Sequence, residues 1–299
     1  MPAHKVLLVE PRNFYSNPQT AFDNFFQHEL KNSSPDEINS LAFEEFYSLV
    51  NKLTEAGIDV TVFKQEDDLF TPDATFPNNW FSTHPDGTLV LYPMKAENRR
   101  LERRPGVIAH LKKNYPQFVD LSFYESKSTF LEGTGSLVLD QRNKVAYASL
   151  SKRTDSHVLT EWSQLMNYEL VTFTSFDSSH QMIYHTNVMM CLGDDFSIIC
   201  LESIHDEKEK KLVQSKLNST HHEIIEISTD QMQHFCGNCL PLENKSGQKF
   251  LVMSDRAFSN FKKDQLTMIE KFWSIIHSNL NTLETIGGGG ARCMIAELF

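Results

Sequence analysis

The sequence predicts a mixed α/β fold in which five similar units form a ring. Five helical segments recur along the chain, and each is followed by a short run rich in β-branched and aromatic residues. A turn of small residues and an apolar strand come after each run, so the pattern repeats about every 50 residues. The alternative is an ordinary α+β domain in which this spacing arises by coincidence.

The first helix is expected over residues 35–56, where apolar residues recur at helical spacing. Ser34 supplies an N-cap, Pro35 a first-turn proline and Glu37 the acid of a capping box, and Gly57 ends the segment. Four further helices are expected at residues 97–114, 154–167, 205–218 and 259–281.

The β-rich runs after these helices lie at residues 60–63, 118–123, 170–174, 223–227 and 282–286. The small-residue turns that follow occupy residues 76–81, 131–139, 184–191, 235–242 and 287–298. A second strand then follows in the first four units, for example through the hairpin signal at 85–87. The fifth unit has one strand left, and the N-terminal segment 5–10 is expected to complete it. In a ring the five turns converge, which predicts one central site.

Composition restricts the classes of function. The chain has 299 residues without a linker-like stretch, so one domain over 1–299 is expected. The net charge of -11 argues against nucleic acid and anionic membranes as partners. Neither a membrane span nor a secretion signal is visible, which favours a cytoplasmic protein.

The five cysteines are odd in number, which makes a disulfide framework unexpected. Cys236 and Cys239 form a CxxC motif, but no second such pair exists to complete a four-thiolate zinc site. A structural role is favoured over metal or redox use. We therefore expect neither a metal nor an organic cofactor.

The converging turns bring Cys293, His185 and Glu132 into one candidate site. A cysteine attacks as its thiolate, an imidazole can move the proton, and a carboxylate can orient the imidazole. Each residue alone has a simpler explanation, since Cys293 could be a small buried apolar residue and Glu132 could cap a loop. The position of all three on equivalent turns favours catalysis.

These residues lie in three short motifs: GGGGARCM holds Cys293, LEGTG holds Glu132, and HTN holds His185. The motifs resemble those of the pentein superfamily of guanidino-modifying enzymes, and most closely those of its citrulline-utilisation hydrolases. The resemblance implies a five-bladed α/β propeller of ββαβ units with pseudo-fivefold symmetry. It also implies Cys293 as nucleophile, His185 as acid and base, and Glu132 as the partner of the histidine.

A fourth stretch, PDATFPNNWF, resembles the substrate-binding segment of the dimethylaminohydrolases, with Asp73, Phe76 and Asn79 at its three positions. The neighbouring Asn78 is a further candidate for substrate binding. Where the deiminases carry Asp, this chain has Asn79 and also Asn187. A guanidinium carries only donors, whereas a neutral ureido group has one acceptor oxygen, which an amide N–H can contact.

We therefore expect hydrolysis of a ureido or guanidino amino acid, most simply citrulline to ornithine, through a covalent Cys293 intermediate. Arginine deimination, amidino transfer and a non-catalytic binding module are the alternatives. Arg292 is the candidate partner of a substrate carboxylate or of the thiolate, whereas the arginines at 99–104 are expected on a solvated helix face. A thiolate-forming Cys293 should react selectively with iodoacetamide at neutral pH. The expected partner is a small molecule, and a homo-oligomer remains open.

Overall fold

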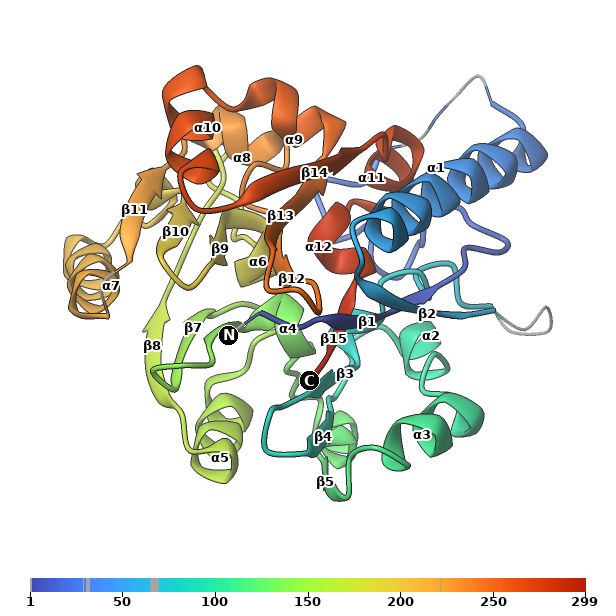
Figure 1. Ribbon diagram of the computed structural model, residues 1–299. Coiled ribbons are helices and arrows are strands. Elements are labelled where there is room, and N and C mark those ends of the chain that lie inside the picture. Colours follow the sequence, from blue (N-terminus) through green and yellow to red (C-terminus); the bar gives the residue numbers. More distant parts are fainter. Residues whose placement is uncertain (1, 29, 31–32, 65–69, 221) are drawn as a thin grey trace.

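The computed structural model describes residues 2–28, 30, 33–64, 70–220 and 222–299. It contains five three-stranded sheets arranged around a common centre (Figure 1). Their strands, from the inner to the outer, are β15 (Ala296–Leu298), β1 (Lys5–Val9) and β2 (Asp59–Phe63); β3 (Phe81–Thr83), β4 (Thr88–Leu91) and β5 (Gln117–Asp120); β6 (Val138–Asp140), β7 (Val145–Ser149) and β8 (Glu169–Phe173); β9 (Met190–Leu192), β10 (Phe196–Ile199) and β11 (Glu223–Glu226); β12 (Leu240–Glu243), β13 (Lys249–Ser254) and β14 (Ser274–Ser278).

Every sheet has the same pairing. The inner strand runs antiparallel to the middle strand, and the middle strand runs parallel to the outer one. Parallel neighbours need a crossover connection, and a helix at the rim supplies it in each unit (Figure 1). These helices are α1 (Pro35–Glu55), α3 (Pro105–Lys112), α5 (Ser156–Met166), α7 (Glu207–Ser219) and α10 (Lys263–Glu270). The five ββαβ units confirm the expected propeller.

The first unit is joined from both ends of the chain. Strand β1 pairs with β15 on one side and with β2 on the other, so the expectation for the N-terminal segment is confirmed. Helix α1 begins with the capping box of Ser34 and Glu37. It buries Phe46, Leu49 and Leu53 against the apolar residues of this unit, which contributes roughly 1.5–3 kcal/mol for each side chain.

Two sequence expectations for helices are corrected. The segment 97–114 forms α2 (Glu97–Arg100) and α3, because Pro105 begins a new helix and disfavours helical geometry in the residue before it. The segment 259–281 contains the end of α9 (Asp255–Asn260), then α10 and β14. Strand β14 has adjacent isoleucines and pairs with β13, so its β-branched residues and sheet pairing outweigh the helical pattern.

The run at 282–286, expected to be a strand, lies in helix α11 (Asn281–Gly287). Its first turn is stabilised from outside the helix, because the Glu45 carboxylate accepts from the backbone N–H groups of Thr282 and Leu283. Gly288 ends the helix with a φ of 67°, a conformation that favours glycine. The contacts with Glu45, which is distant in the sequence, cannot be recognised from the local sequence.

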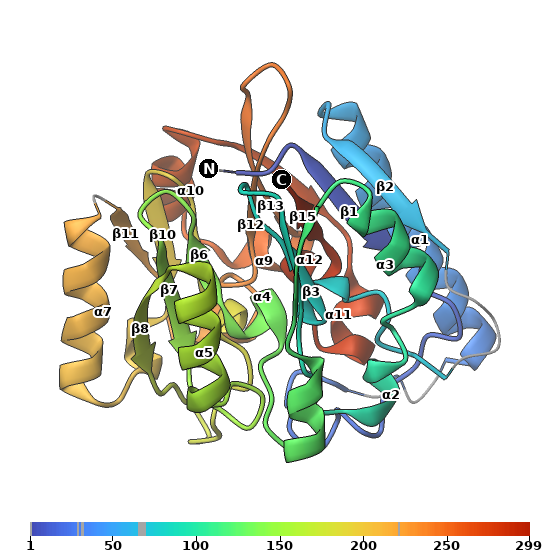
Figure 2. The same cartoon turned by 90° about the horizontal axis from the view of Figure 1, so that it is seen from below.

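The turns meet at the centre of the ring as short helical segments: η1 (Pro77–Asn79), α4 (Gly133–Ser136), α6 (Thr186–Met189) and α12 (Ala291–Met294). Figure 2 shows α4 and α12 close to the middle of the molecule. The segments approach so closely that a Cβ at Gly133 would lie 2.4 Å from the Asn78 backbone oxygen. The small residues of the turns therefore allow the convergence that the site requires.

Within the described residues, no helix is both long enough and apolar enough to cross a membrane.

Candidate active site

Glu132 and His185 face each other at the centre. Glu132 directly precedes α4 and His185 directly precedes α6, and His185 Nε2 lies 2.8 Å from Glu132 Oε2. Both residues are buried. Burial alone would raise the pKa of Glu132, but the charge of Arg153 and the bond with His185 outweigh it and hold that pKa well below its usual range. The carboxylate is therefore ionised.

Burial lowers the pKa of His185, even though the hydrogen bond to Glu132 acts in the opposite direction. The imidazole is thus neutral at pH 7. Since Glu132 is an ionised acceptor, the proton of the imidazole lies on Nε2. Nδ1 consequently carries a lone pair, and His185 lines the central cavity. This is the protonation state that a general base needs.

Cys293 lies in α12 beside two amide side chains. Asn238 Nδ2 donates to Cys293 Sγ over 3.3 Å, and Asn187 Nδ2 lies 3.6 Å from the same sulfur. Burial raises the pKa of the thiol, and the two amides and Arg292 reduce this effect without reversing it. The resting residue is therefore a neutral thiol, whose anion the amides stabilise once the proton leaves.

A small cavity is lined in part by Cys293. Its lining also includes His185, together with Asp73, Phe76 and Asn79 from the first turn. Asp73 Oδ2 accepts from Asn17 Nδ2 over 2.8 Å and from Thr20 Oγ1 over 3.0 Å. Asp73 Oδ1 and Asn79 Nδ2 are buried without a hydrogen-bond partner among the described residues.

Arg99 determines how the amide of Asn79 is oriented. Its Nη1 donates to Asn79 Oδ1 over 2.7 Å, while Nε and Nη2 bind the two oxygens of Glu102 over 2.8 and 3.0 Å. A guanidinium has no acceptor, so the oxygen of Asn79 must face Arg99. The nitrogen is then the group that remains for the cavity.

The N-terminal segment 17–27 contacts the cavity wall through polar side chains, and Asn24 is itself part of the lining. Asn17 and Thr20 hold Asp73, and Asp23 forms ion pairs with Arg153 and Lys95. Asn24 and Gln27 both donate to the Gly287 backbone oxygen, over 3.3 and 3.1 Å. These contacts tie a stretch without regular secondary structure to the turns beneath it.

A model of the family described as N,N dimethylarginine dimethylhydrolase, eukaryotic, matches residues 10–299. The chain belongs to this dimethylarginine dimethylhydrolase family. The family is part of the pentein superfamily, so the resemblance noted in the sequence is confirmed, and with it the assignment as a hydrolase. A search of curated proteins found no significant match.

Solved structures share the fold of this family member at low sequence identity. The product-bound N-terminal domain of ArgZ, an arginine dihydrolase from cyanobacteria, is 17% identical with a TM-score of 0.76, over 99% of this chain and 97% of that chain. An AgrE cysteine variant in complex with L-arginine is also 17% identical with a TM-score of 0.76, but only 40% of that chain is covered. A dimethylarginine dimethylaminohydrolase adduct with S-methyl-L-thiocitrulline is 13% identical with a TM-score of 0.68, and both chains are covered completely.

The structure brings most of the residues singled out in the sequence to one place. Cys293, His185, Asp73, Phe76 and Asn79 line the cavity, and Glu132 contacts the histidine from behind. Two asparagines lie differently from what was expected. Asn187 contacts the cysteine sulfur, and the side chain of Asn78 is buried next to the cavity without lining it.

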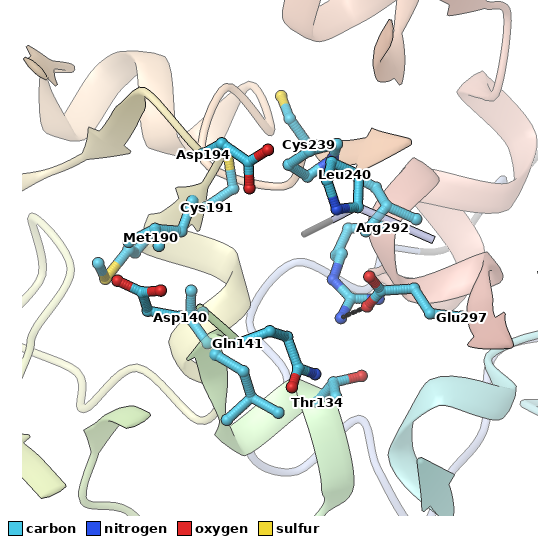
Figure 3. A pocket seen from close by; sticks show the side chains of 16 residues that line it. Thr134, Asp140, Gln141, Met190, Cys191, Asp194, Cys239, Leu240, Arg292 and Glu297 are labelled. Atoms are coloured by element: carbon cyan, nitrogen blue, oxygen red, sulfur yellow. Dashed lines mark hydrogen bonds and ion pairs between the residues drawn. The ribbon is translucent and has the colours of Figure 1, made fainter. Parts of the chain in front are cut away.

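The expectation that Arg292 binds the substrate is corrected. Its guanidinium donates to the Ile295 backbone oxygen and to Glu297 Oε2, each over 3.1 Å. It thereby lines a separate pocket together with Glu297 and Thr134 (Figure 3). Consecutive residues of a helical turn point in different directions, so Cys293 faces the substrate cavity and Arg292 does not. Its charge still favours the thiolate.

The expectation that Arg99 lies on a solvated helix face is also wrong, because Arg99 is buried in the cavity wall. Its neighbour Glu102 completes the buried pair. Asn238 lies in the fourth of the converging turns, where a site residue was expected. Arg153 was missed as a member of the site, because it follows β7 by a few residues and lies outside these turns.

Burial keeps Cys293 mainly as the thiol at neutral pH, and its selective alkylation relative to the other cysteines stays a prediction. Cys236 and Cys239 are buried as well, and Cys239 Sγ lies 3.3 Å from the Cys236 backbone oxygen.

Proposed function

We propose that this hydrolase cleaves a ureido C–N bond, with citrulline as the simplest substrate. One observation carries the proposal: Asn79 and Asp73 line the cavity, and among the described residues Asn79 Nδ2 has no acceptor and Asp73 Oδ1 no donor. A ureido group has a carbonyl oxygen to accept from the former and N–H groups to donate to the latter. A guanidinium has only donors and would leave the N–H of Asn79 without a partner.

The charges of the cavity support a neutral reacting group. Arg99 lies in its wall, and both anionic neighbours are already paired with it: Glu102 lies 2.8 Å from its Nε and Asp73 Oδ2 lies 4.0 Å from the same atom. A cationic group would have to approach this buried guanidinium at close range. A ureido group avoids that repulsion.

The proposed reaction begins when Cys293 Sγ attacks the ureido carbon and its proton passes to His185 Nδ1. Negative charge develops on the carbonyl oxygen, where the N–H of Asn79 stabilises it. His185 then returns the proton to the δ-nitrogen of the substrate, that C–N bond breaks, and ornithine leaves. A carbamoyl group remains on the sulfur.

In the second half, His185 takes a proton from water, and the hydroxide attacks the carbamoyl carbon. The C–S bond breaks, the thiol recovers its proton, and carbamate decomposes to ammonia and carbon dioxide. Glu132 keeps Nε2 protonated throughout and stabilises the imidazolium that forms twice. In sum, citrulline and one water give ornithine, ammonia and carbon dioxide.

Arg153 is the candidate partner for the α-carboxylate of an amino-acid substrate. It lines the cavity, and its guanidinium is held by Asp23 and, over 3.5 Å, by Glu132. Arg is the usual residue for such recognition because its planar fork matches a carboxylate. Arg292, which points elsewhere, is not part of this proposal.

A guanidino substrate such as arginine is the second candidate. The observation in its favour is Asp73, whose free oxygen could pair with a cation. The similar folds add support, since ArgZ is described as an arginine dihydrolase and one of its structures holds a covalently bound reaction intermediate. Amidino transfer would follow the same first half but use an amine in place of water.

The test compares citrulline and arginine side by side, with ornithine and citrulline quantified by mass spectrometry and ammonia by a coupled assay. We expect ornithine from citrulline, no turnover of arginine, and complete loss of activity in Cys293→Ser. Turnover of arginine but not citrulline would replace the ureido assignment with the guanidino one. A Cys293→Ser variant with full activity would refute the covalent mechanism.

A further inference from the structure

Another buried carboxyl group lies beside the glycine loop that leads to Cys293 and has no part in the reaction described above. Glu284 belongs to α11, immediately before the glycine loop that leads to Cys293, and it is completely buried. Its Oε2 lies 3.2 Å from Arg256 Nε. Ser254 is near, but no hydrogen bond of standard geometry joins it to the carboxyl, and the described residues provide no hydrogen-bond donor to Oε1.

The unpaired oxygen of Glu284 and the amide oxygen of Asn238 both lie beside Gly290. A Cβ at Gly290 would lie 3.2 Å from Glu284 Oε1 and 2.9 Å from Asn238 Oδ1. Both oxygens are buried, and the described part of the chain supplies a hydrogen bond to neither. Two buried acceptors without a donor are costly, and a proton on the carboxyl, donated to the amide oxygen, would satisfy both.

Asn238 cannot remove this cost by rotating its amide. Its Nδ2 donates to the Asn187 backbone oxygen over 2.8 Å and to Cys293 Sγ over 3.3 Å. Turning the amide around would place an oxygen against both the carbonyl and the sulfur. The nitrogen must therefore face Cys293, and the oxygen stays beside Gly290 and Glu284.

We propose that Glu284 is a positioning residue which carries its proton and donates it from Oε1 to Asn238 Oδ1, so that the amide N–H stays on the sulfur of Cys293. The inference rests on the proposed role of Cys293 as the nucleophile. In this proposal Glu284 acts on the thiolate only through Asn238 and touches neither the sulfur nor the substrate.

The surroundings of Glu284 agree with a protonated carboxyl. Burial raises its pKa to about 8, and the charges of Glu45 on α1 and of Asp255 on α9 act in the same direction. Arg256 on α9 is the positive charge that opposes them. The group is accordingly neutral at pH 7 and becomes an ionised acceptor only in more alkaline solution.

The experiment compares Glu284→Gln, which keeps a donor, with Glu284→Met, which has a similar shape but no donor. We expect Glu284→Met to lower kcat by about tenfold, with KM unchanged, and Glu284→Gln to restore most of the loss. The rate of Cys293 modification by iodoacetamide, followed by peptide mass spectrometry below pH 8, where Glu284 carries its proton, should fall in Glu284→Met and recover in Glu284→Gln.

A double-mutant cycle separates positioning from folding. In an Asn238→Ala background, Glu284→Met should cost nothing further, because its effect passes through that amide. Asp155→Ala is the structural control, since it removes the N-cap of α5 and acts on neither Glu284 nor Asn238. It should lower the melting temperature and leave the alkylation rate unchanged.

Additive effects of Asn238→Ala and Glu284→Met would overturn the proposal, and so would equal alkylation rates in the Gln and Met variants. If Glu284→Met does not fold, infrared spectroscopy of the wild type decides. The carbonyl stretch of a neutral carboxylic acid should be present at pH 7 and absent in Glu284→Gln, and its absence from the wild type would refute the proposal. Alkylation needs no substrate, so these outcomes stand even if citrulline and arginine both prove inert.

Discussion

Arg99 Nη1 donates to Asn79 Oδ1 over 2.7 Å, and this single hydrogen bond leaves the amide N–H of Asn79 as the group available to the substrate. Because Arg99 is itself held by both oxygens of Glu102, it cannot turn away. Asn79 is thereby fixed as a donor toward the cavity. An aspartate at this position would present only acceptors, which is the arrangement that a guanidinium requires.

Asn79→Asp should therefore lower kcat/KM for citrulline. The variant loses the donor that stabilises the developing negative charge and adds a carboxylate in its place. We expect a loss on the order of 100–1,000-fold, the effect of removing one donor of this kind, measured as steady-state ornithine release.

Asn78→Asp is the matched control for that change, because it introduces the same charge at the neighbouring residue, which does not line the cavity. It is expected to retain far more activity with citrulline than Asn79→Asp does. Similar losses in the two variants would mean that added charge alone is responsible and that Asn79 has no specific contact with the substrate.

The Glu132–His185 pair predicts a characteristic pH profile. Since burial lowers the pKa of His185, the active neutral imidazole should persist below pH 6.5, and activity should decline only in more acidic solution. Glu132→Gln removes the negative charge that stabilises the imidazolium and introduces an amide donor that no longer fixes the tautomer, so kcat should fall by roughly 100–10,000-fold. A pH series of kcat/KM checks both statements, and an acidic limb above pH 6.5 in the wild type would contradict the first.

Gly135 tests how tightly the centre is packed. A Cβ there would lie 2.4 Å from Asn79 Nδ2 and 2.7 Å from His185 Nδ1. Gly135→Ala must displace both groups, and displacements of this size cost on the order of 100-fold in rate. Gly106→Ala in α3 is the control, since a Cβ there meets nothing within 4 Å. It should keep full activity, and equal activity in the two variants would show that the centre is not rigid.

Local sequence was sufficient for the repeated units, because capping residues, hairpin turns and β-branched runs report on their own backbone. It also located Cys293, His185 and Glu132, which lie on equivalent turns. It failed where a distant partner decides the outcome. Arg99 looks like one member of a charged helix face until Glu102 and Asn79 enclose it, and α11 looks like a strand until Glu45 caps it.

The raised pKa of Glu284 also predicts how stability changes with pH. The unfolded carboxyl titrates near 4.5 and the folded one near 8, so between these values the folded state holds a proton that the unfolded state has released. The stability from this group is complete below pH 4.5 and is lost as the pH rises toward 8, at up to about 1.4 kcal/mol per pH unit. The Gln side chain does not titrate, so the free energy of unfolding of Glu284→Gln should rise relative to that of the wild type as the pH increases across this window.

Urea unfolding of both proteins at several values between pH 5 and 9 measures the difference, and it needs neither a substrate nor the thiol. Glu207→Gln, at an exposed position of α7, controls for the loss of one negative charge. Parallel curves for the wild type and Glu284→Gln would mean that Arg256 keeps the carboxyl ionised in the folded protein. Asn238 would then have no donor behind it, and the amide would hold the cysteine sulfur without help from α11.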